Sequence, residues 1–172
     1  MQKIKAYLIG EGVSTNESEA FSLYKKSVFG EPIGDKIQYT LTEAMFLVEK
    51  GKLEIYFKNR KIKKEELIKK FQIIDKKFSL KYVVFNDLRE KGYVVKTALK
   101  FGADFRVYEK CKRPGKEHAK WIVFVDHEAN KTSWQEFSAK NRVAHSTKKN
   151  LLIAIVDEEL DVSYYEVKWI RP

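Results

Sequence analysis

Apolar positions in the first part of the chain change from a helical spacing to an alternating one. Residues Thr40–Glu43 have the Thr-x-x-Glu spacing of a helix capping box. A stripe of apolar residues at helical spacing follows over 41–48, and Gly51 predicts the end of this helix. Apolar and polar residues then alternate over Leu53–Phe57, which is typical of a half-buried strand. The N-terminal part of the chain therefore mixes helices with strands.

A second helical region contains a break in its spacing. Apolar residues recur at helical spacing from Leu67 to Gly92, but the spacing shifts within Asp75–Ser79. We therefore predict two helices, and we place a domain boundary in the break between them. Residues 1–77 are expected to form an N-terminal α+β domain, and residues 78–172 a C-terminal domain.

Beyond residue 92 the pattern is mostly that of strands. The predicted strands are Tyr93–Thr97, Asp104–Glu109, His118–Asp126, Leu151–Asp157 and Val162–Ile170. One helix, predicted over Thr132–Lys149, joins two of these strands. The fold class is therefore α+β. We expect helices with a small mixed sheet in the first domain, and a mixed sheet flanked by helices in the second.

The charge of the chain narrows the choice of partner. Lys and Arg number 34 against 24 Asp and Glu, which gives a formal net charge of +10. A surplus of this size favours a polyanionic partner, either nucleic acid or an anionic membrane. A lysine- and glutamate-rich thermophile surface would give a similar composition. No apolar run approaches the roughly 20 residues that span a bilayer, so we expect no membrane association.

Cysteine and histidine are both scarce. Cys111 is the only cysteine, which excludes an intrachain disulfide and a cysteine-based zinc site and agrees with a reducing, cytoplasmic location. His118, His127 and His145 fit no common zinc-binding spacing. We therefore expect neither a metal nor a cofactor.

The three histidines differ in their surroundings. His118 lies where a basic loop containing Pro114 and Gly115 meets a predicted strand. Loops held by a rigid sheet commonly carry functional residues, although an ordinary surface histidine would have the same surroundings. His145 falls in the predicted helix, where local packing or hydrogen bonding would explain it equally well. His127 falls in a predicted turn and is expected to be solvated.

Several basic residues are candidates for binding the phosphates or bases of a nucleic acid. Lys148 and Lys149 end the predicted helix, where the helix dipole favours cations, and Arg142 stands two turns earlier on the same face. The strand that follows could instead hold Lys149 over the sheet edge, and the Arg142 guanidinium could pair with phosphate or stack on a base. Arg106 and Tyr108 share one face of their strand, a nucleic-acid signal that an ordinary cross-strand pair would also give.

A competing pattern occurs near the C-terminus. Glu166 and Lys168 form a Glu-x-Lys pair, as at the end of a metal-dependent nuclease motif. That motif also needs an aspartate on an adjacent strand. Asp161 is too close in sequence, and Asp104 is the other candidate. Glu-x-Lys pairs arise often by chance in a chain this rich in both residues, so this alternative is the weaker one.

The C-terminal part of the chain resembles the archaeal tRNA-splicing endonuclease family. The segments that carry the resemblance are KGYVVKTALKFGADFRVYE, GKEHAKWIVFV and RVAHSTKKNLLIAIVD. The resemblance covers essentially all of Leu80–Val167 in the same order, and YTLTEAMFLVEKGKLEI resembles a helix-strand unit of the family's N-terminal domain. The first 35 or so residues match weakly.

The resemblance implies an enzyme that cuts precursor tRNA at both ends of an intron, at a bulge-helix-bulge structure. It implies a metal-independent reaction that leaves a 2′,3′-cyclic phosphate and a 5′-hydroxyl. The family's catalytic tyrosine, histidine and lysine fall on Tyr108, His118 and Lys149, with Lys148 beside the lysine. Arg142 resembles an arginine that helps to hold a flipped bulge base. His145 is not the catalytic histidine in this comparison.

The resemblance also implies an assembly of four subunits, because two cuts at a fixed spacing need two active sites. The assembly would be a homotetramer, or a heterotetramer with a non-catalytic relative. Four acidic residues resemble the family's loop that docks into a neighbouring subunit, namely Asp157, Glu158, Glu159 and Asp161. A solvated hairpin turn would have the same composition. A non-catalytic RNA-binding subunit of the same family is the main alternative function, although such a subunit would be expected to lack part of the catalytic trio.

Overall fold

The computed structural model describes residues 3–172, which divide into two compact units, one ending at Tyr82 and one comprising Val83–Pro172. The division falls inside α4 (Phe78–Glu90). The sequence pattern instead places the domain boundary after residue 77, and that exact position stays a prediction. The two units are described separately below.

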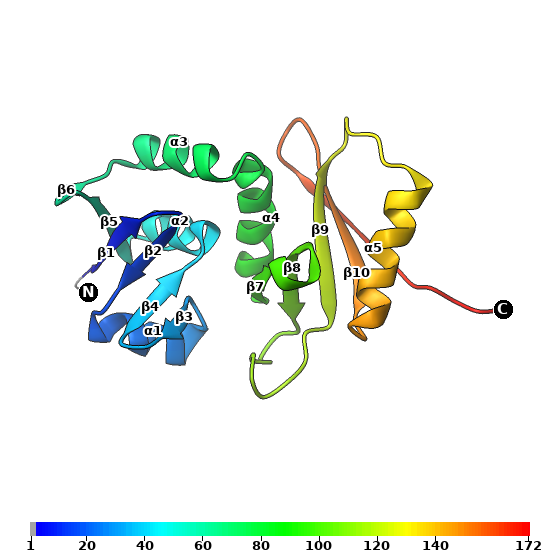
Figure 1. The fold of residues 1–172 in the computed structure, drawn as a ribbon, viewed down its shortest axis with the longest axis horizontal. Helices are drawn as coiled ribbons and strands as arrows, with labels where there is room; N and C mark the ends of the chain where they lie inside the picture. The colour runs from blue at the N-terminus through cyan, green and yellow to red at the C-terminus, as the bar shows by residue number, and fades with distance from the viewer. Residues whose placement is uncertain (1–2) are drawn as a thin grey trace. The chain divides into compact units, whose positions relative to one another are not determined.

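A six-stranded sheet forms the centre of the N-terminal unit (Figure 1). The strand order is β3-β4-β2-β1-β5-β6. The central strand β1 (Ile4–Ile9) runs antiparallel to β2 (Gly12–Thr15) and parallel to β5 (Leu53–Phe57). The remaining strands are β3 (Glu31–Ile33), β4 (Lys36–Tyr39) and β6 (Arg60–Lys61). The sheet is mixed, as the sequence predicts.

The helices of the N-terminal unit are α1 (Ser18–Ser27), α2 (Leu41–Glu49) and α3 (Lys64–Ile74). The capping box predicted at the start of α2 is confirmed. The Thr40 hydroxyl accepts a hydrogen bond from the Glu43 amide, and the Glu43 carboxylate accepts one from the Thr40 amide. Glu43 is 2 % exposed, and it also accepts a hydrogen bond from the Gly30 amide at 3.1 Å. The buried carboxylate therefore joins the start of α2 to the turn before β3.

The C-terminal unit has a five-stranded sheet in the order β11-β10-β9-β8-β7. Its strands are β7 (Val94–Ala98), β8 (Ala103–Tyr108), β9 (Trp121–His127), β10 (Asn150–Val156) and β11 (Val162–Val167). Only β9 and β10 pair in parallel, and a short 3-10 helix, η1 (Leu99–Phe101), follows β7. α5 (Trp134–Ser146) provides the crossover between β9 and β10.

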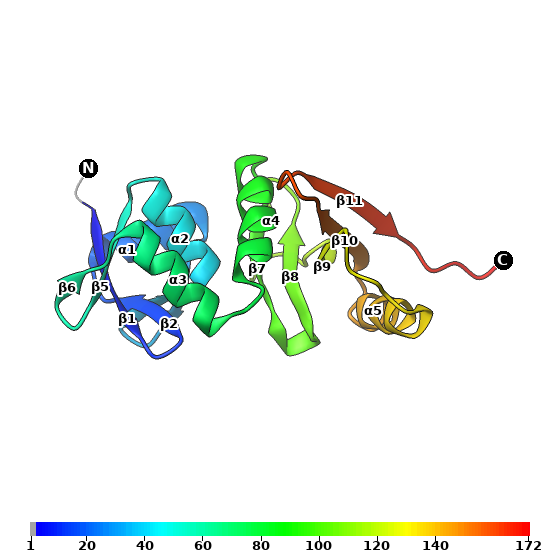
Figure 2. The same ribbon diagram turned by 90° about the horizontal axis from the view of Figure 1, so that it is seen from above.

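Helices cover both faces of this sheet. α4 lies on one side and α5 on the other (Figure 2). On the α4 side, the rings of Phe85 and Phe105 are 6.0 Å apart, and the Tyr164 hydroxyl donates to the Asp87 carboxylate at 2.6 Å. On the α5 side, Ala144 packs in a buried cluster with residues that include Ile122 and Leu151. The prediction of a mixed sheet flanked by helices is confirmed.

The helix predicted over Thr132–Lys149 is shorter at its C-terminal end than expected. The Thr147 hydroxyl donates to the Val143 carbonyl at 2.9 Å, and Lys148 adopts a left-handed conformation with φ of 55°. These two features end α5 and turn the chain into β10. The prediction that Lys148 and Lys149 occupy the last turn of the helix is therefore wrong, and so is the prediction that Arg142 and Lys149 share a helix face.

Candidate active site

Three segments that are distant in sequence meet at one end of the C-terminal sheet. Tyr108 is the last residue of β8, and Lys149 immediately precedes β10. His118 lies three residues before β9. Because β8 is antiparallel to β9 and β9 is parallel to β10, the end of β8 and the starts of β9 and β10 lie at the same edge.

Backbone hydrogen bonds hold these segments in register. The Lys120 amide donates to the Val107 carbonyl at 2.9 Å, and the Asn150 amide donates to the Lys120 carbonyl at 2.9 Å. The Lys149 amide donates to the Ala144 carbonyl in α5 at 2.9 Å. The backbones beside Tyr108, His118 and Lys149 are therefore fixed to one another by the sheet and by α5.

Lys149 has a partly buried and cationic environment. Its ammonium donates to the Thr147 carbonyl at 2.8 Å and lies 5.7 Å from the centre of the Phe101 ring. Burial lowers the pKa of Lys149, and the nearby positive charge of Arg106 lowers it further. The ammonium keeps unused hydrogen-bonding capacity, because a lysine has three donors. This group is suited to stabilising negative charge on a bound phosphate.

Arg106 and Tyr108 lie on the same face of β8, as their spacing predicts. Arg106 pairs in register with Lys96 of β7, which is 3 % exposed. Tyr108 is 4 % exposed. Since Lys149 interacts electrostatically with Arg106, this face gathers three cationic side chains and a phenol near the end of the sheet. Such a cluster favours an anionic ligand.

His118 differs from Tyr108 in being exposed to solvent. It belongs to the 109–120 loop, in which the Lys116 and Glu117 amides donate to the Arg113 carbonyl. The neighbouring Ala119 is buried, so the end of the loop is anchored against the domain while the imidazole stays accessible. The loop that carries His118 therefore ends at the same edge as Tyr108 and Lys149, and its imidazole is accessible to solvent.

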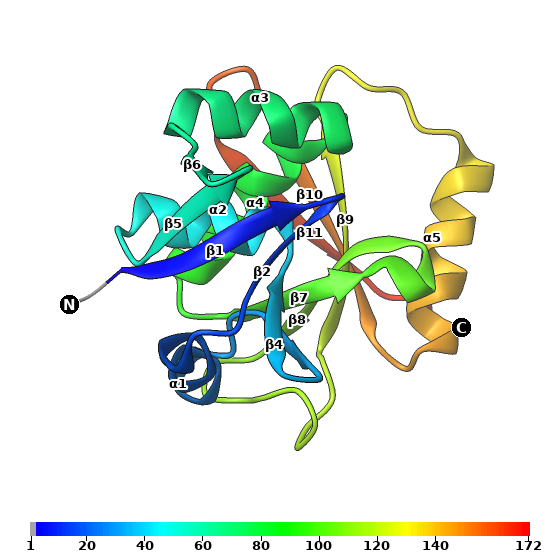
Figure 3. The ribbon, with the colours of Figure 1, turned by 60° about the vertical axis from the view of Figure 1, so that its left-hand side comes forward.

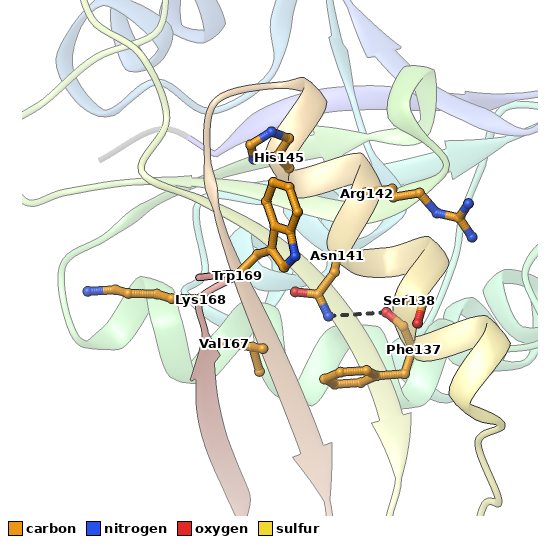
Figure 4. Close-up of a pocket in the computed structure, with 8 residues that line it drawn as sticks. All are labelled: Phe137, Ser138, Asn141, Arg142, His145, Val167, Lys168 and Trp169. Carbon is orange, nitrogen blue, oxygen red and sulfur yellow. Dashed lines mark hydrogen bonds between the residues drawn. The ribbon is translucent and has the colours of Figure 1, made fainter. Parts of the chain in front are cut away.

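His145 and Arg142 belong to a different feature, a pocket of about 510 Å³ between α5 and the segment after β11 (Figure 4). Its lining residues are Phe137, Ser138, Asn141, Arg142, His145, Val167, Lys168 and Trp169. The His145 ring packs edge-on against the Trp169 indole, with ring centres 4.7 Å apart. Trp169 could not be predicted as a member of this pocket, because nothing in its sequence spacing relates it to α5.

Lys148 is the remaining basic residue predicted from the sequence. Its side chain is exposed, and its amide donates to the His145 carbonyl at 3.0 Å in the turn that ends α5. The left-handed conformation of Lys148 lies between the helix and Lys149. No described contact joins Lys148 to Arg106 or Tyr108, so Lys149 is the lysine that this part of the structure associates with the strand face.

The Glu-x-Lys pair is occupied by other contacts. The Glu166 carboxylate accepts from the Trp121 indole at 3.1 Å and from the Asn150 amide group at 2.8 Å, and Lys168 lies 3.4 Å away. Strands β9 and β10 separate it from Asp104, whose carboxylate accepts from the Val125 amide. Within residues 3–172, no three His, Cys, Asp or Glu side chains cluster in a way that could hold a metal ion.

Comparison with known families identifies the class of protein to which this fold and candidate active site belong. The profile of the catalytic C-terminal domain of tRNA intron endonucleases matches residues 78–164, and the profile of their N-terminal domain matches residues 4–68. Both profiles describe an RNA-processing nuclease. The chain belongs to the tRNA intron endonuclease family, and it is an enzyme that excises introns from precursor tRNA.

Curated relatives extend over nearly the whole chain. The tRNA-splicing endonuclease of Thermococcus kodakarensis is 43% identical over 166 residues, which cover 96% of this chain and 97% of the relative. The protein of the same name from Nanoarchaeum equitans is 43% identical over 144 residues, which cover 80% of this chain and 92% of the relative. That from Methanothermobacter thermautotrophicus is 39% identical over 166 residues, or 95% of this chain and 96% of the relative.

These findings decide between the functions that the sequence left open. The alternative of a non-catalytic subunit is set aside, because the matching C-terminal profile is that of the catalytic domain. Among residues 3–172, no helix is both long and apolar enough to cross a bilayer.

Proposed function

We propose that this enzyme cleaves precursor tRNA at bulge-helix-bulge splice sites by internal transesterification, with Tyr108, His118 and Lys149 as its catalytic residues. The ribose 2′-oxygen attacks the adjacent phosphorus, and the bond from phosphorus to the 5′-oxygen breaks. The products are a 2′,3′-cyclic phosphate and a 5′-hydroxyl. The observation that carries this proposal is the shared sheet edge at which all three segments meet.

Each residue type suits one requirement of this reaction. His118 is the general acid that protonates the leaving 5′-oxygen, because an imidazole exchanges protons near neutral pH. Lys149 stabilises the added negative charge on the pentacoordinate phosphorane. Tyr108 removes the proton of the 2′-hydroxyl or orients that hydroxyl. A phenol has an ordinary pKa of about 10, so nearby cations would help it to act as a base.

The surrounding basic residues support RNA binding at the same edge. Arg106 interacts electrostatically with Lys149. In this proposal it binds the phosphate at which the RNA is cut or the adjacent phosphate. Lys148 is exposed on the adjoining turn and is assigned to a phosphate farther along the strand. Lysine and arginine contacts of this kind would hold helical RNA by its backbone, without reading its sequence.

The α5 pocket supports recognition of an unpaired bulge base. Arg142 and Trp169 both line this pocket, and in Figure 4 the Arg142 guanidinium points outward from α5, away from the indole ring. Both groups stack favourably on an unstacked base, which a continuous duplex does not offer. In this proposal Arg142 helps to hold the flipped base, and His145 fixes the orientation of Trp169 without taking part in proton transfer.

We expect the purified enzyme to cleave a bulge-helix-bulge RNA in the presence of EDTA. The reaction needs no metal if His118 and Lys149 supply the proton and the positive charge. The cleaved ends are then analysed: the 5′ fragment should carry a cyclic phosphate, and the 3′ fragment should accept phosphate from polynucleotide kinase without prior dephosphorylation. Cleavage that returns only with magnesium, or that leaves 5′-phosphates, would favour the metal-dependent alternative at Glu166 and Lys168.

We also propose that the working enzyme has four subunits, joined in part by the acidic loop. This loop consists of Asp157, Glu158, Glu159 and Asp161. The Asp161 amide donates to the Asp157 carboxylate at 2.8 Å, so the turn has a defined shape. Leu160 lies within it at 60 % exposure, which gives the loop an apolar contact among its charges. An exposed loop of this kind suits a complementary basic groove on a neighbouring subunit.

The mass of the chain in solution tests this assembly. Light scattering after size exclusion should give four times the 20.2 kDa of one chain. Replacing the four acids by Asn and Gln should shift the protein to a smaller species. The matched control replaces four exposed acids of the N-terminal unit, namely Glu11, Glu19, Asp35 and Glu65, and should keep the original mass. A smaller mass for the unaltered chain would instead mean that a second type of subunit is needed.

A further inference from the structure

One face of the N-terminal sheet is open to solvent. Along β1, alternate side chains are buried and exposed, so that Lys5, Tyr7 and Ile9 share the exposed face. The opposite face packs against α2, which contacts β2, β4 and β5. Figure 3 views the sheet from its open side, with β1 drawn in front of α2. The residues on this open face are not needed for the core of the unit.

Two tyrosines lie side by side near the centre of this open face. Tyr7 of β1 and Tyr56 of β5 are direct partners in the parallel register, and their ring centres are 6.0 Å apart at an angle of 42°. Tyr7 is 43% exposed, and Tyr56 is half-buried. On the other side of Tyr7, its antiparallel partner on β2 is the small residue Ser14. The two rings therefore form an aromatic surface that a flat ligand can approach.

A charged network holds the second ring in place. The Tyr56 hydroxyl donates to the Glu54 carboxylate at 3.3 Å. The same carboxylate binds the Lys61 ammonium at 2.7 Å and lies 3.5 Å from the Lys3 ammonium. The hydrogen bond from Lys61 lowers the pKa of Glu54, so the carboxylate stays ionised and keeps its partners. A ring fixed in this way loses little conformational freedom when a ligand stacks on it.

The face carries more positive than negative charge. Its exposed lysines are Lys3, Lys5, Lys36 and Lys61, against the carboxylates of Glu31 and Glu54. Two of these lysines offset Glu54 directly, which leaves Lys5 and Lys36 available for an outside anion. A face that has both two aromatic rings and a surplus of cations matches a ligand that has both flat bases and phosphates.

We propose that this tyrosine platform, made of Tyr7, Tyr56 and the four lysines on the same face, binds unpaired nucleotides of precursor tRNA. The bases stack on the two rings, and the phosphates lie against Lys5 and its neighbours. Unpaired RNA fits better than a duplex, because bases in a helix already stack on one another and do not expose their faces. The platform is an RNA-binding site separate from the cleavage site in the C-terminal unit.

Binding to a short single-stranded RNA tests the platform directly. The probe is a fluorescent octauridine containing 4-thiouridine, titrated against the full chain and followed by anisotropy. Tyr7→Ala should weaken binding about tenfold, the size expected for the loss of one base-aromatic stack. Tyr7→Phe keeps the ring and should bind within about twofold of the unaltered protein. Ile73→Ala removes an apolar side chain of α3 that is 82% exposed, and it should change nothing.

Two further measurements locate the site and exclude a protein interface. Ultraviolet cross-linking of the same probe should label peptides that contain β1 or β5. Tyr7→Ala should leave unchanged both the oligomeric mass and the turnover of a short splice-site RNA without single-stranded tails. Cross-links confined to residues 83–172, equal affinity for Tyr7→Ala, or an altered mass would each overturn the proposal. None of these outcomes affects the assignment of the cleavage site.

Discussion

Replacing His118 by alanine is expected to slow RNA cleavage by a factor of about 10² to 10⁴, the usual contribution of a general acid, while RNA affinity stays within about twofold. His118 is the histidine whose loop ends at the sheet edge shared by Tyr108 and Lys149. It is exposed, so its loss removes a proton donor without opening a cavity. Single-turnover cleavage of a bulge-helix-bulge RNA and filter binding of the same RNA measure the two quantities.

The matched control is His145→Ala, which removes the same side chain from α5. Because the His145 ring packs on Trp169, this variant should mainly weaken RNA binding and should reduce the cleavage step far less. A substrate with a 5′-bridging sulfur sharpens the comparison, since a thiolate leaves without protonation. That substrate should restore most of the rate to His118→Ala. Equal losses in the two variants, or no recovery with sulfur, would show that His118 is not the general acid.

Much of the fold could be predicted because its signals are local. The Thr40 capping box and the shift of apolar spacing after Ile74 involve residues only a few positions apart, and both correspond to real element boundaries. The end of α5 was harder to predict. It depends on the Thr147 side chain bonding back to the helix and on a left-handed Lys148, and neither has a strong sequence signal.

The surroundings of the candidate site depend on contacts between distant segments. Phe101 belongs to η1 and Arg106 to β8. Both residues are close to Lys149 only because the strands pair in the sheet. Trp169 lines the pocket beside α5 although it belongs to the segment after β11. Its position in the sequence does not indicate this contact. Tyr108, His118 and Lys149 were chosen by resemblance to a family. Their common sheet edge gives that choice a physical basis, and their catalytic roles stay predictions.

Lys149 is the proposed catalytic residue whose surroundings the structure describes in most detail. Lys149→Met removes the cation but keeps an unbranched side chain against Phe101. If Lys149 stabilises the phosphorane, this change should lower the cleavage rate by about 10²- to 10³-fold, as removal of a donor to a developing oxyanion does. Lys149→Arg keeps the charge and should recover part of the rate. Equal rates for the Met and Arg variants would mean that position 149 contributes packing rather than charge.

The pH dependence of cleavage tests the same assignment independently. Burial and the charge of Arg106 both lower the pKa of Lys149, so the unaltered enzyme should lose this cation at a lower pH than an ordinary lysine would. Its cleavage rate should therefore fall at an alkaline pH at which Lys149→Arg, with a permanently charged guanidinium, is still unaffected. Arg106→Gln should raise the pKa of Lys149 and move the alkaline fall to higher pH, whatever its effect on RNA affinity. Single-turnover rates measured across the alkaline range provide the comparison. If the cleavage rates of the unaltered enzyme and of Lys149→Arg fall at the same alkaline pH, the titration of another group, such as the Tyr108 phenol, causes the fall.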